Sequence, residues 1–354
     1  MIKNEFNVIG IMSGTSLDGI DLVYANFNLN THWSFEIINA ETIGYSDKWH
    51  NTLENLVSTS IKDLKVIDTN YTEYLSKVIK AFINKYDIKK IDAICSHGHT
   101  ALHQPENKLT YQIGNKPFLA KLLKETVVCD FRVQDVDLGG QGAPLVPIGD
   151  SLLFSEFDFC LNLGGFANIS MDVKGDRIAY DVCPVNIVLN RYVNTLGFNY
   201  DHKGKIASKG IINTELLNQL NALDFYTQKH PKSLGLEWVN NTVFPIIDTF
   251  NLEVQDILKT FVEHIAIQIV SEINKKKSAT VFITGGGVYH TYLINRIQAY
   301  SNQKIIVPNH EVVEFKEALI FGFLGVLKLR HEVNCLKSVT GASKDHSSGK
   351  IFLP

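Results

Sequence analysis

The sequence predicts an α/β protein in which one folding unit occurs twice. An apolar, β-prone stretch, a polar glycine turn and a second strand follow one another near residue 7 and again near residue 157. The chain has 354 residues, 45% of them hydrophobic, which is enough to build two domain-sized cores. A duplicated unit of this kind predicts a cleft between the two copies.

The first copy has the predicted order β-β-β-α-β. Its helix is assigned from apolar residues at helical spacing, among them Leu75, Ile79 and Phe82. The predicted elements are strands at residues 7–12, 20–27 and 35–43, a helix at 71–86 and a strand at 91–95.

The second copy repeats this opening. Its first helix starts with Pro184, because proline is tolerated in the first helical turn. The predicted elements are strands at residues 157–163, 168–173 and 177–180, a helix at 184–196, a helix at 255–274, a strand at 279–284 and helices at 289–300 and 315–329. We therefore expect an N-terminal lobe at 1–145 and a C-terminal lobe at 146–354, with a loop or tail at 340–350.

Composition excludes several function classes. The net charge is −3, and the one basic run, at 275–277, fits a solvated helix end better than a nucleic-acid surface. No apolar run is long enough to span a membrane and no secretion signal is apparent, so we expect a cytoplasmic protein. The five cysteines are widely spaced without a C-x-x-C pair, which favours reduced, buried thiols over disulfides or a zinc site.

Three glycine-rich turns indicate nucleotide binding. Phosphate oxygens need backbone N–H donors at close range, and glycine permits that approach. Each turn alone is more often a plain connection, but their order within a duplicated fold favours nucleotide binding. The candidate nucleotide-binding residues are Gly14, Thr15, Ser16, Leu17, Asp18, Gly19, Ile20 and Asp21 in the first turn, Asn162, Gly164, Gly165 and Asn168 in the second, and Gly285, Gly286 and Gly287 in the third.

The first turn joins two strands and is not a Walker A loop, because no Gly-Lys-Ser/Thr follows it. Its hydroxyl and N–H groups are expected to hold the β- and γ-phosphates, and Asp18 to hold hydrated Mg²⁺. Asp21, in the following strand, is expected to support this turn. The third turn lies between a strand and a helix, where flat glycine backbone can lie against a base and ribose.

The run at residues 10–21 resembles the opening signature of the anhydro-N-acetylmuramic acid kinases. The resemblance extends in order over nearly the whole chain, and the blocks at 10–21 and 138–147 are long enough to be specific. The remaining matching blocks are residues 96–100 with His103 and Pro105, 112–114, 130–132, 162–168, 285–287, 317–319 and 338–342.

This resemblance implies the duplicated actin/hexokinase-like (ribonuclease H-like) fold, with a nucleotide cleft between two lobes. It also implies a kinase that uses ATP and Mg²⁺ to open the ring of 1,6-anhydro-N-acetylmuramic acid with water and to phosphorylate O6. The product would be N-acetylmuramic acid 6-phosphate, in cell-wall recycling. A homodimer is the family expectation.

The resemblance also assigns roles to residues. Asp181 occupies the position of the family's catalytic base, and Glu317 is expected to help place the water or sugar. Arg132 is expected to contact sugar or phosphate, and His97 and Asn186 to contact the sugar.

The chain departs from the family pattern near the base. Val182, Cys183 and Val185 stand where the family more often has threonine and two glycines. Leu234 and Leu236 replace a common threonine and arginine, and two histidines, at 99 and 290, replace glutamine and asparagine. These differences leave open a kinase for a different amino sugar or anhydrosugar, or a non-catalytic nucleotide-binding regulator on the same fold.

Other roles remain open for the site residues. Asp181 could cap the helix predicted to begin at Pro184, Glu317 could be a first-turn acid that the helix dipole favours, and Arg132 could pair with a neighbouring aspartate. His97, with the histidines at 99 and 103, could suggest a metal site, but no carboxylate completes a known ligand pattern.

Overall fold

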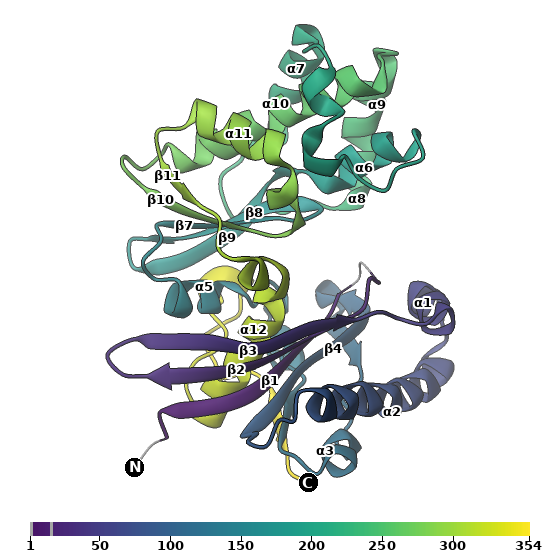
Figure 1. Cartoon of the computed structure of the whole chain (residues 1–354), viewed down its shortest axis with the longest axis vertical. Coiled ribbons are helices and arrows are strands. Elements are labelled where there is room, and N and C mark those ends of the chain that lie inside the picture. Colours follow the sequence, from purple (N-terminus) through teal and green to yellow (C-terminus); the bar gives the residue numbers. More distant parts are fainter. Residues whose placement is uncertain (1–2, 15–16) are drawn as a thin grey trace. The chain divides into compact units, whose positions relative to one another are not determined.

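The computed structural model describes residues 3–14 and 17–354, and these form two compact units (Figure 1). The first unit comprises the described residues up to Leu153 together with Phe315–Pro354, and the second is Phe154–Glu314. The predicted division at 145/146 therefore lies slightly too early. It also places the C-terminal segment in the wrong unit.

The first unit is built on a mixed sheet of seven strands in the order β12-β6-β4-β1-β2-β3, with β5 beside β4. β1 pairs antiparallel with β2 and parallel with β4. The elements are β1 (Glu5–Ser13), β2 (Ile20–Leu29), β3 (Trp33–Ile43), α1 (Asp47–Glu54), α2 (Ile61–Lys85), β4 (Ala93–Gln104), β5 (Leu109–Ile113), α3 (Phe118–Leu123), β6 (Val127–Cys129), α4 (Val133–Asp137), α5 (Pro147–Leu153), α12 (His310–Leu329, which begins in the second unit), α13 (Lys337–Thr340) and β12 (Lys350–Phe352).

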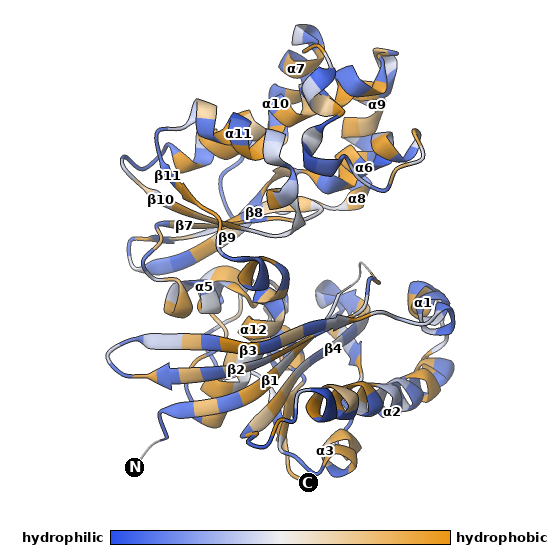
Figure 2. Ribbon diagram, in the orientation of Figure 1, coloured by the Kyte–Doolittle hydropathy of each residue, from blue (hydrophilic) through white to orange (hydrophobic). Residues whose placement is uncertain are grey.

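Helices cover both faces of this sheet at β1. Ile9 and Ile11 pack in a cluster with α2 and α3, whereas the alternate residues Val8 and Gly10 face α12. A Cβ at Gly10 would lie 2.1 Å from the carbonyl oxygen of Ala318, so only glycine allows α12 to approach this strand. Figure 2 shows the difference between the two helices: α2 mixes polar and apolar residues, whereas α12 is largely apolar, as a buried helix requires.

The second unit is built on a five-stranded sheet in the order β11-β10-β7-β8-β9. Its core cluster joins the sheet to α6, α10 and α11. The elements are β7 (Phe159–Leu163), β8 (Phe166–Val173), β9 (Asp176–Pro184), α6 (Asn186–Asn194), α7 (Thr214–Asn221), α8 (Leu236–Trp238), α9 (Phe244–Thr249), α10 (Val254–Ile273), β10 (Thr280–Thr284), α11 (Thr291–Tyr300) and β11 (Lys304–Ile306).

The two sheets share one strand order, which confirms the predicted duplication. In each unit the first three strands form an antiparallel meander, and two further strands add in parallel beside the first of them. The orders β3-β2-β1-β4-β6 and β9-β8-β7-β10-β11 correspond strand by strand. This is the duplicated ribonuclease H-like, or actin/hexokinase-like, α/β fold.

The C-terminal segment completes the first unit, contrary to the predicted division. α12 packs on β1, and β12 pairs antiparallel with β6. His346 and Ser348 are buried, so residues 340–350 are a packed segment although they contain little regular structure. The prediction divided the chain at a single point along the sequence. The first unit is instead defined by packing between two segments that are distant in sequence.

All five cysteines are buried free thiols, in agreement with the predicted burial. Within residues 3–14 and 17–354, no helix has both the length and the apolar character needed to cross a membrane.

Candidate active site

The first glycine turn connects β1 to β2 in the first unit. Leu17 has a positive φ of 62°, and its N–H donates to the Gly14 carbonyl oxygen over 3.4 Å. A Cβ at Gly19 would lie 2.6 Å from the Ile43 carbonyl oxygen, so this position requires glycine. Asp18 is exposed, and its carboxylate is open to solvent.

The remaining candidates in this turn divide into two groups. Thr15 and Ser16 lie outside the described residues. Ile20 is buried at the start of β2, and the Asp21 carboxylate accepts a hydrogen bond from the Thr42 hydroxyl over 2.6 Å. This bond ties the beginning of β2 to β3, in agreement with a supporting role for Asp21.

A buried polar network lies at the end of β1. The Ser13 hydroxyl is 2.5 Å from the Tyr45 hydroxyl, 3.0 Å from the Tyr71 hydroxyl and 2.8 Å from Nδ1 of His99. Burial raises the pKa of Tyr45 to about 12 and lowers the pKa of His99 to about 4. All four side chains are therefore neutral at pH 7 and fix the residue from which the first turn departs.

His97 and Arg132 form a hydrogen-bonded pair. His97 Nδ1 donates to the Gly98 carbonyl oxygen over 2.8 Å, and its Nε2 accepts from Arg132 Nε over 2.8 Å. Burial, together with the nearby guanidinium, lowers the pKa of His97 well below its ordinary value. Arg132 also donates to the Gly142 carbonyl oxygen over 2.6 Å, whereas Asp130 pairs with a lysine, so Arg132 is a positioned cation and not part of a surface ion pair.

Helix α12 brings Glu317 to this pair. The Phe321 ring lies one turn after Glu317, 4.7 Å from the His97 ring and 5.9 Å from the Arg132 guanidinium carbon. Burial lowers the pKa of Arg132 to about 10, and attraction to the Glu317 carboxylate opposes this shift. The structure thus brings three predicted site residues of the first unit, His97, Arg132 and Glu317, into one constellation.

The second and third glycine turns pack against each other in the second unit. β7 and β10 pair in parallel, with Asn162 beside Thr284, so both turns leave the same edge of the sheet. A Cβ at Gly285 would lie 2.6 Å from Asn162 Oδ1, and one at Gly287 would lie 2.6 Å from Leu163 Cβ. The close approach of the two turns therefore requires glycine at both positions.

Gly286 differs from its neighbours. It is exposed, and a Cβ there would meet no atom within 4 Å. Its backbone thus presents a flat, open surface, which fits a base or ribose lying against it.

Asp181 lies near the end of β9, opposite Asn168 of β8. Its carboxylate oxygen Oδ2 accepts a hydrogen bond from the Leu234 N–H over 2.8 Å, and its own N–H donates to the Lys232 carbonyl oxygen over 3.2 Å. Burial raises the pKa of Asp181, and the Leu234 N–H opposes this shift. α6 begins at Asn186 without a side-chain cap, so the capping role considered for Asp181 is wrong.

The second turn is joined to the start of α6. The N–H of Asn186 donates to the Gly164 carbonyl oxygen over 3.3 Å, and the N–H of Val185 donates to the Gly165 carbonyl oxygen over 2.8 Å. Val182, Cys183 and Val185, which depart from the family pattern, are buried in the core cluster of the second unit. Leu236 is 48% exposed, so it is a surface difference.

Sequence reasoning missed the groups that orient these side chains. The Leu234 N–H is a backbone donor, and a backbone donor leaves no signal in the sequence. Phe321 carries a weak signal, because it follows Glu317 at the i, i+4 spacing of one helix face. The network around Ser13 joins residues up to 86 positions apart, which spacing alone does not relate.

Comparisons with known proteins agree with the sequence resemblance. A family model described as anhydro-N-acetylmuramic acid kinase matches residues 6–354. The chain is 31% identical over 366 residues to the anhydro-N-acetylmuramic acid kinase of Sulfurimonas denitrificans, covering 97% of this chain and 98% of that one. It is 32% identical over 378 residues to the protein of the same name from Mannheimia succiniciproducens, covering 99% and 100%.

A solved structure also resembles the chain at low identity. It is an activator of the 2-hydroxyisocaproyl-CoA dehydratase from Clostridium difficile with bound ADPNP. The two chains are 13% identical, the match covers 92% of this chain and 95% of the other, and the TM-score is 0.46.

Proposed function

Because the chain belongs to the anhydro-N-acetylmuramic acid kinase family, we propose that it phosphorylates 1,6-anhydro-N-acetylmuramic acid with ATP in cell-wall recycling. The product is N-acetylmuramic acid 6-phosphate. The observation that carries this proposal is the family match over residues 6–354, which includes the Asp181 position and all three glycine turns.

The reaction couples two bond cleavages. The oxygen of a water molecule attacks the anomeric carbon, the bond from that carbon to O6 breaks, and a proton of the water passes to a carboxylate base. O6 then attacks the γ-phosphorus of ATP, and the bond from this phosphorus to the bridging oxygen of ADP breaks. The base finally returns its proton to solvent, which balances the reaction.

In this proposal Asp181 is the base. Its carboxylate is half-buried and held through Oδ2 by the Leu234 N–H, which leaves Oδ1 available to accept a proton from water. Arg132 and Glu317 orient the sugar, with His97 fixing the Arg132 guanidinium through its Nε2 acceptor. Asn186 contributes a further sugar contact at the start of α6.

The proposed nucleotide site uses the three glycine turns. Gly286 presents open backbone to the base and ribose, and the turn of the first unit holds the phosphates through its N–H groups and the hydroxyls of Thr15 and Ser16. The exposed Asp18 carboxylate fits a hydrated Mg²⁺, since Mg²⁺ usually retains several waters. When bound, this ion supplies positive charge to the phosphate oxygens during transfer.

The proposal is tested with purified protein, Mg-ATP and the anhydro sugar. We expect ADP release to depend on the sugar, and mass spectrometry to show a product heavier by one water and one phosphoryl group. In water enriched in ¹⁸O, the heavy oxygen should appear at the anomeric hydroxyl. ATP binding without any phosphorylated product would contradict the assignment and favour a nucleotide-binding regulator.

A second candidate is a kinase for a different amino sugar or anhydrosugar. The exposed Leu236 favours it, because a common arginine of the family is absent from this surface segment. The buried positions Val182, Cys183 and Val185 give it less support, because their side chains lie in the core of the second unit. A screen of anhydro and amino sugars by ADP release separates the two candidates.

The proposal extends to assembly and location, for which the family resemblance is the support. A cytoplasmic homodimer is expected. Sedimentation velocity of the purified protein measures the assembly, and cell fractionation of the native host measures the location.

A further inference from the structure

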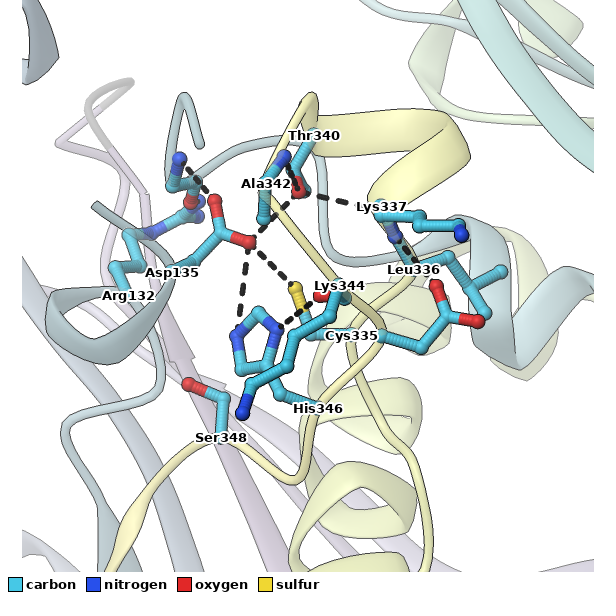
Figure 3. Close-up of polar contacts among 12 residues, drawn as sticks. Arg132, Asp135, Cys335, Leu336, Lys337, Thr340, Ala342, Lys344, His346 and Ser348 are labelled. Atoms are coloured by element: carbon cyan, nitrogen blue, oxygen red, sulfur yellow. Dashed lines mark hydrogen bonds and ion pairs between the residues drawn. The ribbon is translucent and has the colours of Figure 1, made fainter. Parts of the chain in front are cut away.

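Three potential metal-ligating side chains meet in the first unit, and none of them is a residue assigned to the kinase site. They are Asp135 of α4, Cys335 after α12, and His346 near the C-terminus, and all three are buried. Asp135 Oδ1 lies 3.1 Å from Cys335 Sγ and 3.6 Å from His346 Nε2. Figure 3 shows the Asp135 carboxylate between Cys335, His346 and Thr340.

His346 gives independent evidence that a cation belongs here. The side chain is about 5% exposed, and Nδ1 lies 3.1 Å from the Lys344 carbonyl oxygen, to which it can only donate. In the neutral ring Nε2 is therefore the acceptor. Nε2 has no hydrogen-bond partner among the described residues and faces the Asp135 carboxylate. His346 Nε2 and the Asp135 carboxylate are thus two acceptors that face each other in the protein interior. Such a pair requires a positive charge between the two atoms, either a metal ion or a proton.

The donor set and its spacing favour a metal ion. Thiolate, imidazole and carboxylate are the ligands of zinc, with bonds of about 2.0–2.3 Å. Tetrahedral ligands at these bond lengths lie about 3.3–3.5 Å apart. The two separations at Asp135, 3.1 and 3.6 Å, lie on either side of that range. With a proton at His346 in place of a metal, the Cys335 thiol would only donate a hydrogen bond to Asp135, whereas a metal ion takes all three side chains as ligands.

We propose that Asp135, Cys335 and His346 bind a zinc ion that has a structural role. The Thr340 hydroxyl lies 2.7 Å from the same Asp135 oxygen and is placed to supply a fourth ligand. Binding replaces the thiol proton of Cys335, which is released to solvent as the zinc–sulfur bond forms. The buried setting suits a closed structural site better than a catalytic one, which keeps a position for substrate.

The site would stabilise the C-terminal segment and the sugar-binding arginine together. The second oxygen of Asp135 accepts a hydrogen bond from the Gly142 N–H over 2.7 Å, and the Gly142 carbonyl oxygen accepts from Arg132. An ion held by Asp135 is thus two hydrogen bonds from the Arg132 guanidinium. Since Cys335 and His346 follow α12, the same ion fixes the segment that ends in β12.

The proposal is tested on the full chain, purified without a metal-affinity tag. We expect about one zinc per chain by elemental analysis, and a lower Tm after removal of the metal with a chelator. Replacement by Co²⁺ should give the near-ultraviolet absorption of a thiolate bound to cobalt. Cys335→Ser should lose this absorption and bind zinc at least tenfold more weakly, while its hydroxyl can still donate to Asp135.

A matched control is Cys160→Ala, which removes a buried thiol of the second unit and should retain both the zinc and the absorption. Wild-type protein that takes up no equimolar zinc and keeps its Tm in chelator overturns the proposal, and assigns the charge at His346 to a proton. A cobalt absorption that persists in Cys335→Ser also overturns it. The zinc content and the Tm of the wild type decide whether zinc binds even if the variant fails to fold. All these readouts are independent of kinase activity.

Discussion

The Leu234 backbone N–H donates a hydrogen bond to the Asp181 carboxylate over 2.8 Å. Burial raises the pKa of Asp181, and this bond opposes the increase because it stabilises the charged form. The carboxylate is therefore held in one orientation by a group that no side-chain substitution at position 234 removes, apart from proline. An aspartate that is oriented and partly desolvated is suited to accept a proton from water.

The Asp181→Asn variant should lose turnover while keeping its nucleotide affinity. Removal of a general base lowers rates by about 10²- to 10⁴-fold, so kcat should fall by that factor while the Kd for ATP changes by less than about twofold. Steady-state kinetics and calorimetric titration measure the two quantities. Asp176→Asn, which changes an exposed carboxylate at the first residue of β9, is the control and should retain full activity.

The same variant should be more stable than the wild type at neutral pH. Since the folded pKa of Asp181 is raised, the folded protein binds this proton more tightly than the unfolded chain, and its stability falls as pH rises through the folded pKa. Asparagine carries no charge and can still accept the Leu234 N–H. The gain in Tm for Asp181→Asn should therefore be present at pH 7 and shrink as pH is lowered towards the ordinary aspartate pKa. A loss of stability at pH 7 would argue against a desolvated carboxylate.

Arg132→Lys should weaken the binding of the sugar and leave the binding of ATP unchanged. Lysine keeps the charge but cannot reproduce the two directed bonds to His97 and the Gly142 carbonyl oxygen. Loss of an oriented charged contact is worth about 1.5–3 kcal/mol, so KM for the sugar should rise about tenfold or more, with an unchanged KM for ATP. Arg191→Lys, at a half-exposed arginine of α6, is the matched control. An equal effect on both KM values would place Arg132 outside the sugar site.

His99→Gln should make the protein less sensitive to acid. Burial lowers the pKa of His99 to about 4, so the unfolded chain takes up this proton first as pH falls. The stability that His99 confers is complete above its ordinary pKa and is lost between about pH 6.5 and pH 4, by up to about 3 kcal/mol. Denaturant titrations of wild type and variant at several pH values measure the difference in slope. His50→Gln, which changes an exposed histidine, should leave the slope unchanged.

Gly286→Ala and Gly287→Ala separate nucleotide binding from folding. A Cβ at Gly286 meets no atom within 4 Å, so Gly286→Ala should keep its Tm yet raise KM for ATP by obstructing the flat surface. A Cβ at Gly287 would meet Leu163 at 2.6 Å, so Gly287→Ala should destabilise the protein by about 1–3 kcal/mol. If Gly286→Ala leaves KM for ATP unchanged, the third turn does not contact the nucleotide.

Much of the fold could be predicted from the chain, since strand patterning and glycine turns are local signals. The strands near residues 7, 20, 35 and 157 lie where alternation and apolar runs predict them. The predicted start of α2 lies ten residues too late, because the apolar residues of its first turns do not mark one buried face: Ile61 and Val66 are exposed, whereas Asp68 is buried. The sequence-based division places the C-terminal segment in the wrong unit, because its partner strand, β6, is more than 200 residues away in sequence.

The sequence by itself determined the duplicated α/β architecture and the family, and it is the basis on which Asp181, Arg132 and Glu317 are proposed as site residues. These depend on local order and on motifs that are continuous along the chain.

Only the tertiary structure decided which groups orient them: the Leu234 N–H, the ring of Phe321 and the contact between His97 and Arg132. It alone brought Asp135, Cys335 and His346 together, because the ligands come from three distant segments and no spacing of cysteines signals them. Packing between distant segments sets these contacts, and the chemistry of a side chain depends on the neighbours that packing gives it.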